Sequence, residues 1–257
     1  MSAQILPLSG VHNFRDYGGY ALTGGGRLRR RMLYRSGQHF EATRDDLDRI
    51  GRLGLRAVID LRSDSERRLA PCRRPENFNS RVVFVPDDLA QAPHLEAAAK
   101  IDGPESATSR MRAIYAVMPF WPYFVKALRA YFLTLIETDG PTLVHCAAGK
   151  DRTGIAVALL HDLMGVHCDD LMENYLRTND PDRIDAHLAS GAQSLRATYG
   201  SQLSDAAARV LLSVHPAYLE AAFEAIKERH GDVAAYLSHE ISLPPDLRER
   251  LLLRLAD

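Results

Sequence analysis

The chain has 257 residues, of which 46% are hydrophobic, and its 32 basic and 33 acidic side chains leave a formal net charge of −1. A chain of this length can form one large domain or two small ones. Because the charges are balanced, no broad field attracts nucleic acid or an anionic membrane, and any attraction for phosphate must be local. We therefore expect no nucleic-acid partner.

Cysteine use is typical of a reducing compartment. The three cysteines, Cys72, Cys146 and Cys168, form an odd set that lacks the spacing of a disulfide framework or a zinc site. The first residues lack the basic and apolar regions of a signal peptide, and no stretch reaches the length of a membrane span. We expect a cytoplasmic protein without metal, cofactor or stable membrane insertion. Secretion without a signal is compatible with the sequence, and the oligomeric state is left open.

The first half of the chain reads as strands separated by helices. Residues 9–38 are rich in glycine and arginine and predict two or three short strands, one over 31–35. Thr43 is expected to cap a helix that runs to Leu53 and stops at Gly54. Buried strands are expected over 55–61 and 81–86.

The hydrophobic pattern weakens between Asp87 and Phe120, where alanines, prolines and scattered charges indicate short helices on a mobile connection. A connection of this length inside a sheet domain is usually functional or disordered. We interpret about 88–120 as a lid insertion that faces the substrate. A passive surface excursion is the alternative.

The second half is expected to be mostly helical around one further strand. A helix over 122–137 leads through a turn into a strand over 142–144, and a buried helix follows over 154–160. Later helices are expected over 169–178, 181–189, 204–212, 216–228, 233–238 and 245–255. Strands that alternate with helices favour a mainly parallel sheet covered on both faces. Without a linker or a repeat, the sequence predicts a single α/β domain over 1–257 with a helical C-terminal region.

The segment from Val144 to Gly154 carries the clearest chemistry. It places a cysteine, five residues and an arginine between an apolar strand and an apolar helix. Such a loop turns N–H groups inward, and the helix N-terminus adds partial positive charge, which favours a thiolate at Cys146. Arg152 can form two hydrogen bonds with two phosphate oxygens. The Thr153 hydroxyl would stabilise the thiolate as it leaves a phosphocysteine.

This segment predicts a phosphatase loop. A nucleotide-binding P-loop is excluded, because that motif needs glycine where Val144 stands and serine or threonine where Asp151 stands. A buried structural cysteine followed by a surface arginine is the plain alternative. Besides Arg152, the residues predicted to bind phosphate are Ala147, Ala148, Gly149, Lys150 and Thr153.

Several motifs appear in an order that resembles a known family. They are Asn13-Phe14-Arg15-Asp16-Tyr17-Gly18-Gly19, Leu33-Tyr34-Arg35-Ser36-Gly37, Asp60-Leu61-Arg62-Ser63 with Glu66, His145 to Gly154, Asn174-Tyr175-Leu176 and Pro216-Ala217-Tyr218-Leu219. From about Val11 onward, this set resembles the bacterial tyrosine phosphatase family that includes the mycobacterial phosphatase PtpB and related lipid phosphatases.

The resemblance implies a protein tyrosine phosphatase-like fold and hydrolysis of phosphate monoesters. The implied substrates are phosphotyrosine, sometimes phosphoserine or phosphothreonine, and phosphoinositides. The Lys150-Asp151 pair is similar to loops of enzymes that accept phosphoinositides, so Lys150 would meet a second phosphate on the inositol ring. A merely solubilising lysine is the alternative. Relatives often carry a helical lid, which would map onto about 91–118.

The leaving group needs a proton from a nearby acid, and two residues compete for this role. Asp151 lies inside the loop, where resembling phosphatases place their acid; a salt bridge with Lys150 is the alternative. Asp87 follows the strand that ends at Pro86. The alternative role for Asp87 is to cap a helix. Asp151 is ranked first.

Other charged residues near the loop are expected to support it. His145 is expected to orient the loop through a backbone hydrogen bond. Asp60, Arg62 and Glu66 are interpreted as a charge network behind the loop, since charges at buried strand ends need partners.

Two other classes of protein remain as alternatives. A binding module would capture phosphorylated ligands without turnover, but Cys146, Arg152 and Thr153 are all present. An arsenate reductase needs relay cysteines, and neither Cys72 nor Cys168 has such a spacing. Sulfurtransferase loops do not typically lead through Arg-Thr-Gly into a helix.

Overall fold

The computed structural model describes residues 6–86, 101–180, 191, 195, 196 and 202–257. Within this part of the chain, one five-stranded sheet has the order β1-β2-β5-β3-β4. The first strand runs antiparallel to its neighbour, and the remaining pairs are parallel. The mainly parallel sheet is therefore confirmed, with an antiparallel edge. The strands are β1 (Arg15–Asp16), β2 (Leu33–Ser36), β3 (Ala57–Asp60), β4 (Arg81–Val83) and β5 (Thr142–His145).

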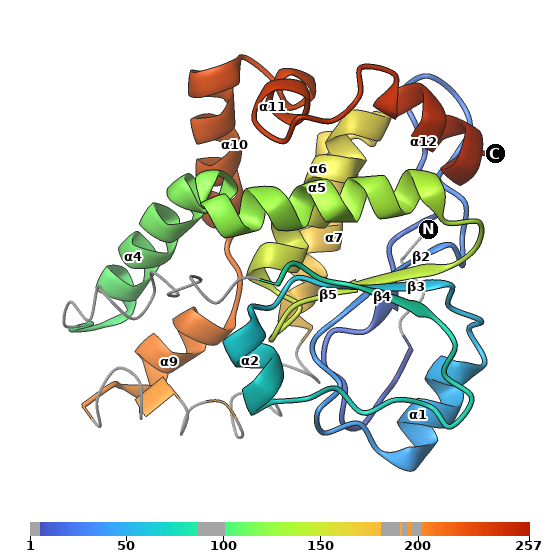
Figure 1. Cartoon of the computed structure of the whole chain (residues 1–257). Coiled ribbons are helices and arrows are strands. Elements are labelled where there is room, and N and C mark those ends of the chain that lie inside the picture. Colours follow the sequence, from blue (N-terminus) through green and yellow to red (C-terminus); the bar gives the residue numbers. More distant parts are fainter. Residues whose placement is uncertain (1–5, 87–100, 181–190, 192–194, 197–201) are drawn as a thin grey trace.

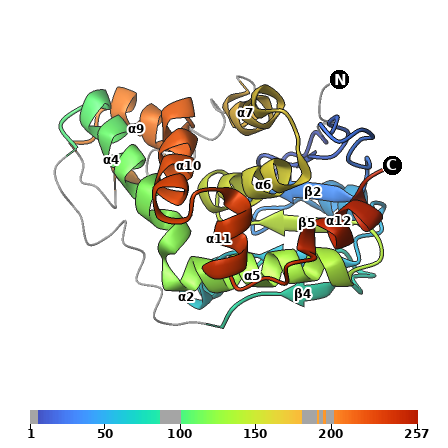
Figure 2. The same ribbon diagram turned by 90° about the horizontal axis from the view of Figure 1, so that it is seen from above.

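Helices lie on both faces of this sheet. The described helices are α1 (Arg44–Gly51), α2 (Asp64–Leu69), α4 (Pro104–Val117), η1 (Met118–Phe120), α5 (Pro122–Glu137), α6 (Asp151–Met164), α7 (Cys168–Leu176), η2 (Arg177–Asn179), α9 (Asp205–Leu212), α10 (Pro216–His230), α11 (Val233–His239) and α12 (Leu247–Leu255). In Figure 1, α5 lies above the sheet and α1 lies below it. Seen from above, α4, α9 and α10 gather at one end of the molecule, and the arrow of β5 points toward this group (Figure 2).

Period-two alternation in the central strands divides their side chains between two hydrophobic clusters. Ile59 and Val144 belong to the large cluster that includes α5 and α6. Val58 and Leu143 belong to the small cluster that includes α1. Both clusters bury apolar surface against the same sheet, as expected for a parallel sheet that is covered on both faces.

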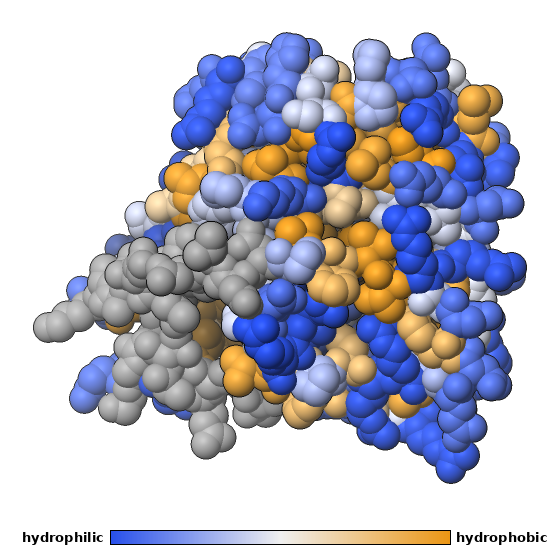
Figure 3. Space-filling view, in the orientation of Figure 1, coloured by the Kyte–Doolittle hydropathy of each residue, from blue (hydrophilic) through white to orange (hydrophobic). Residues whose placement is uncertain are grey.

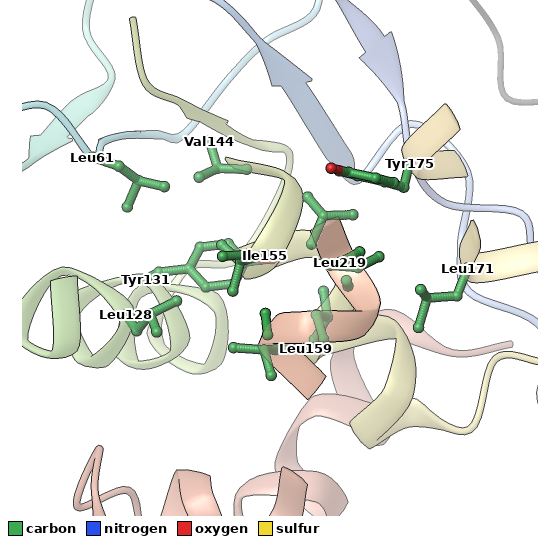
Figure 4. Packing of buried hydrophobic residues seen from close by; sticks show 14 of the residues in the cluster. Leu61, Leu128, Tyr131, Val144, Ile155, Leu159, Leu171, Tyr175 and Leu219 are labelled. Atoms are coloured by element: carbon green, nitrogen blue, oxygen red, sulfur yellow. The ribbon is translucent and has the colours of Figure 1, made fainter. Parts of the chain in front are cut away.

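The large cluster continues through the C-terminal helices. Figure 4 shows side chains of β5, α5, α6, α7 and α10 packed together, with Ile155 and Tyr131 near its centre. On the surface, hydrophobic residues are visible around α5 and hydrophilic residues surround them (Figure 3). Among the described residues, no helix combines the length and apolar character needed to cross a membrane.

Helix α1 begins where the sequence predicts, but it ends earlier than predicted. Thr43 accepts a hydrogen bond from the backbone N–H of Asp46, and the Asp46 side chain accepts from Thr43 in return, which completes a capping box. The helix ends at Gly51, earlier than the predicted Leu53. Gly54 has a φ of +63°, so it serves the turn that follows the helix.

Two helical segments differ from the sequence predictions. In place of short helices, residues 104–117 form the continuous helix α4, which packs against α9 and α10. Helix α2 was not predicted, although Ser63 and Glu66 have the capping-box spacing and form that box. The predicted helix over 181–189 and the first part of the predicted lid lie outside the described residues.

Candidate active site

The predicted phosphate loop lies at the carboxyl edge of the sheet. Residues 146–150 connect the end of β5 to the start of α6. In register, His145 pairs with Ser36 of β2 and with Asp60 of β3, so all three strands end together. Ligands of parallel α/β sheets bind at this edge. The predicted nucleophile, Cys146, is buried there, with 2% of its surface exposed.

Gly149 is fixed in the loop by two buried donors and by the chain behind it. Its carbonyl oxygen accepts from Asn13 Nδ2 at 2.6 Å and from Arg35 Nη2 at 2.9 Å. Its φ is +68°, and a Cβ at this position would lie 2.3 Å from the carbonyl oxygen of Ser36. Only glycine fits this position without a shift of the loop or of β2.

A second layer of polar bonds holds these donors. Arg35 Nη1 donates to Asn174 Oδ1 at 3.2 Å, and Arg15 Nη2 donates to the Asn174 carbonyl at 2.8 Å. Burial lowers the pKa of Arg35, although Cys146 opposes this shift. Sequence reasoning assigned no role to Arg35 or Asn174. For Arg35, the available signal was a charged residue directly after two hydrophobic ones, Leu33 and Tyr34, in a predicted strand.

Arg152 is oriented by Glu66, the third residue of α2. Its Nη1 donates to Glu66 Oε2 at 2.7 Å and to the carbonyl of Leu61 at 3.2 Å, and its Nη2 donates to Glu66 Oε1 at 2.6 Å. Burial opposes the charge of Glu66, but Arg152 reverses this effect and lowers the pKa of Glu66 to about 2. A guanidinium has five N–H groups. Within the described chain, Nε–H and the second Nη2–H of Arg152 form no bond.

Asp60 and Arg62 form a buried ion pair behind the loop. Arg62 donates through Nε to Oδ1 at 2.9 Å and through Nη2 to Oδ2 at 2.8 Å. Burial alone would raise the pKa of Asp60, but His145 and Arg62 lower it to about 2. His145 Nε2 is 3.7 Å from Asp60 Oδ2, and its Nδ1 is 3.2 Å from the carbonyl oxygen of Cys146. The expected charged residues therefore lie together behind the loop, where Asp60 pairs with Arg62 and Glu66 pairs with Arg152.

Asp151, the first-ranked acid, is the first residue of α6 and is bonded on one carboxylate oxygen. Tyr115 Oη donates to Oδ1 at 2.7 Å, and Lys150 Nζ is 3.5 Å from the same atom. The contact with Lys150 is the salt bridge that the sequence left as an alternative. Tyr115 comes from α4, where the sequence pattern is weak, so no signal identified it.

The ammonium group of Lys150 is buried against α9. It donates to the carbonyls of Leu211 and Ser213 at the C-terminal end of that helix. The side chain is 6% exposed. In this arrangement Lys150 connects the loop to α9, and its contact with a second phosphate stays a prediction.

The remaining predicted phosphate-binding residues lie together in the loop and at the start of α6. The Ala147 carbonyl accepts from the backbone N–H of Gln38 at 2.9 Å, and both Ala147 and Ala148 are partly buried. The Thr153 hydroxyl is buried and has no hydrogen-bond partner among the described residues. Asp87, the alternative acid, lies outside the described residues.

Among the residues that the structure describes, two groups of side chains have donor atoms close enough to share a metal ion. Asp60, Cys72 and His145 have such atoms within 4.8 Å of one another. Arg62 Nη2 already bonds both Asp60 Oδ2, at 2.8 Å, and Cys72 Sγ, at 3.1 Å, so a cation neutralises this group. The second group, residues 167–169, is exposed at the start of α7.

Comparisons with known proteins agree with this architecture. The model of the tyrosine phosphatase family matches residues 6–257. A Cupriavidus necator protein named as a tyrosine-protein phosphatase is 33% identical over 245 residues, which are 90% of this chain and 82% of the relative. The triple specificity protein phosphatase PtpB of Mycobacterium tuberculosis is 33% identical over 269 residues, covering 91% of this chain and 92% of the relative. A tyrosine-protein phosphatase of Nostoc commune is 27% identical over 75% of this chain and 63% of its own length.

Fold and comparisons together define a hydrolase of phosphoric monoesters with the protein tyrosine phosphatase architecture. The chain belongs to the tyrosine phosphatase family, as the resemblance in its motifs implied.

Proposed function

We propose that the protein hydrolyses phosphate monoesters in two steps through a phosphocysteine at Cys146. The Cys146 thiolate attacks phosphorus in line with the leaving oxygen, and the P–O bond breaks as the S–P bond forms. A water molecule then attacks phosphorus, and Cys146 leaves as a thiolate. Inorganic phosphate is the second product.

The orientation of Arg152 carries this proposal. Glu66 takes one N–H of each terminal nitrogen, which leaves Nε–H and the second Nη2–H on an adjoining edge of the guanidinium. Two N–H groups on one edge match two oxygens of a phosphoryl group. Arg152 would then stabilise the equatorial oxygens, where negative charge gathers in the transition state.

Thr153 and Asp151 would complete the chemistry. The buried Thr153 hydroxyl has no partner among the described residues, so it is available to donate to the departing sulfur of Cys146. Asp151 would protonate the leaving oxygen, and Asp87 is the second candidate for this role. The backbone of Ala147, Ala148 and Gly149 would contribute N–H donors to the phosphate.

We infer a broad substrate range: phosphotyrosine first, then phosphoserine or phosphothreonine, and phosphoinositides. The triple specificity stated in the name of the 33% identical relative PtpB supports this range. Lys150 would have to leave the carbonyls of α9 before it could meet a second phosphate. Because the reaction needs a reduced thiol at Cys146, we propose that the protein acts in the cytoplasm.

Phosphate release from a panel of substrates tests the proposal. The panel contains phosphotyrosine, phosphothreonine and phosphoserine peptides and mono- and bis-phosphorylated phosphoinositides. We expect Cys146→Ser to abolish release, while Cys168→Ser, which changes an exposed cysteine at the start of α7, keeps the wild-type rate. Acid-quenched wild-type protein should carry phosphate on Cys146 in a mass spectrum. Binding of phosphorylated ligands without release from any substrate would identify a phosphate-binding module instead.

A further inference from the structure

Three side chains from three helices form a chain of hydrogen bonds that ends on the loop. Tyr175 Oη of α7 is 2.9 Å from Tyr115 Oη of α4, which is 2.7 Å from Asp151 Oδ1 at the start of α6. Both tyrosines are buried, with 0% and 1% of their surfaces exposed for Tyr115 and Tyr175. These hydrogen bonds therefore connect the helical core to the partly exposed carboxylate of Asp151.

The direction of these bonds follows from proton counting. Tyr115 has one hydroxyl proton, and an ionised carboxylate can only accept, so that proton lies between Tyr115 and Asp151. Tyr175 is then the donor in the bond to Tyr115. Burial raises the pKa of both tyrosines well above the ordinary value, so both hydroxyls keep their protons at neutral pH.

The two oxygens of the Asp151 carboxylate have different surroundings. Oδ1 faces two donors, the Tyr115 hydroxyl at 2.7 Å and the Lys150 ammonium at 3.5 Å. No bond from another described residue ends on Oδ2. A proton on Oδ1 would compete with both donors, so the protonated acid carries its proton on Oδ2.

We propose that Tyr115 is a positioning residue that holds Asp151 through Oδ1 and thereby presents Oδ2 as the proton-bearing oxygen, with Tyr175 fixing the direction of the Tyr115 hydroxyl. The proposal rests on the assignment of Asp151 as the acid. It also gives α4 a role in the reaction, because this helix supplies the hydrogen bond from Tyr115 to the acid.

The proton balance of the two steps is simple. As the P–O bond of the substrate breaks, the leaving oxygen takes the proton from Oδ2, and Tyr115 and Lys150 stabilise the resulting carboxylate through Oδ1. In the second step the attacking water gives a proton back to Oδ2 as its oxygen bonds phosphorus. Tyr115 gives up no proton in either step, and burial, which raises the pKa of its hydroxyl, favours the protonated form.

A comparison of two leaving groups tests this role. Phenyl phosphate and p-nitrophenyl phosphate have the same ring, but phenolate leaves poorly without a proton and p-nitrophenolate leaves well. A misplaced acid should therefore slow hydrolysis of phenyl phosphate far more than hydrolysis of p-nitrophenyl phosphate. We expect Tyr115→Phe to lower kcat/KM about 30-fold for phenyl phosphate and less than about 3-fold for p-nitrophenyl phosphate, since general acids contribute roughly 100-fold or more. Tyr175→Phe should show the same selectivity with a smaller loss.

The control is a second buried tyrosine pair. Tyr131 Oη lies 3.0 Å from Tyr17 Oη, and both residues are fully buried. Tyr131→Phe should leave the ratio of kcat/KM for the two substrates unchanged. A loss in Tyr115→Phe that is equal for both leaving groups would overturn the proposal, because damage to the fold has no leaving-group selectivity.

A double variant separates this proposal from the acid assignment. If Tyr115 acts through Asp151, Tyr115→Phe has no further selective effect in an Asp151→Asn background. A selective effect of Tyr115→Phe that persists there would overturn the proposal and leave the acid assignment standing. If Asp151→Asn alone shows no leaving-group selectivity, the acid assignment fails. In that case, if Cys146→Ser still abolishes phosphate release, the proposed phosphatase function stands.

Discussion

The terminal nitrogens of Arg152 donate to the two oxygens of the Glu66 carboxylate, at 2.7 and 2.6 Å. Glu66 is itself fixed, because the backbone N–H and the hydroxyl of Ser63 donate to its Oε2 at 2.9 and 3.1 Å. Two parallel bonds define the plane of the guanidinium as well as its position. The first turn of α2 therefore sets the orientation of the arginine in the predicted phosphate loop.

We expect Glu66→Gln to reduce both activity and stability. The amide offers one acceptor in place of two, so Arg152 loses its fixed plane, and kcat/KM should fall at least about 10-fold. Losing one partner of a buried ion pair costs roughly 3–5 kcal/mol, and partial exposure of Glu66 reduces this to about 2 kcal/mol in the free energy of unfolding. Steady-state kinetics and urea unfolding measure the two effects.

An exposed ion pair supplies the control for this substitution. Glu76 lies 3.6 Å from Arg44, and both side chains are more than four-fifths exposed, at 88% and 85%. Glu76→Gln should leave activity and stability within experimental error. Wild-type kinetics in Glu66→Gln would show that Arg152 is oriented by other contacts.

Gly149→Ala should disrupt the loop for two reasons, the left-handed backbone conformation and a steric clash. A left-handed φ costs a residue with a side chain about 1–2 kcal/mol. At Gly149 the new Cβ would also meet the carbonyl oxygen of Ser36 at 2.3 Å, so the loop must move. We expect loss of most activity, measured as kcat/KM, together with a lower melting temperature.

Gly54→Ala is the matched control for that clash. Gly54 has nearly the same φ, +63° against +68°, and nothing lies within 4 Å of a Cβ placed there. This variant should lose about 1 kcal/mol of stability and keep its activity. Equal effects of the two substitutions on kcat/KM would contradict the steric argument.

The central strands and the phosphate loop could be predicted from the sequence because both are local patterns. The apolar strand, the glycine and the start of α6 lie within one short segment, from Val144 to Gly154. The parallel sheet followed from alternating strands and helices, and the shared edge of β3 and β5 followed from that sheet. Helix α4 was harder to predict, because it packs against α9 and α10, which are distant in the sequence.

The contacts that complete the site could not be predicted from local patterns. Tyr115 reaches Asp151 across 36 positions of the chain, and Arg35 reaches Gly149 across 114. A buried arginine in a strand signals an unusual partner, but the sequence does not name that partner. The sequence predicted a network of these charges but not which of them pair, because the partners of Asp60 and Glu66 depend on the fold.

Stability should fall in acid because His39 is buried in its neutral form. Burial, together with the neighbouring His145, lowers the pKa of His39 from 6.5 to about 3. Between these values the unfolded chain binds a proton that the native chain does not. Lowering the pH from 6.5 toward 3 therefore reduces the free energy of unfolding by up to about 1.4 kcal/mol per pH unit, and above 6.5 the effect vanishes.

His39→Gln tests this pH dependence. Glutamine can keep a bond to the Ser36 hydroxyl, which lies 3.1 Å from His39 Nε2, but it does not titrate. Urea unfolding at pH 7, 6 and 5 should show a shallower loss of stability in the variant than in the wild type. His167→Gln, which changes an exposed histidine, should keep the wild-type slope. Equal slopes in His39→Gln and wild type would contradict the prediction.

Asp151→Asn should slow the hydrolysis of a substrate most where the leaving oxygen most needs a proton. An alkyl phosphate such as phosphoserine releases a strongly basic oxygen, so kcat/KM should fall about 100-fold or more, whereas p-nitrophenyl phosphate should lose less than about 5-fold. Asparagine keeps the acceptor oxygen for Tyr115, so the bond from α4 can persist in the variant. Asp169→Asn removes an exposed carboxylate from the first turn of α7 and serves as the matched control, with no expected effect on either substrate. An equal, small loss for both substrates in Asp151→Asn would move the acid role to Asp87, and Asp87→Asn should then show the selectivity.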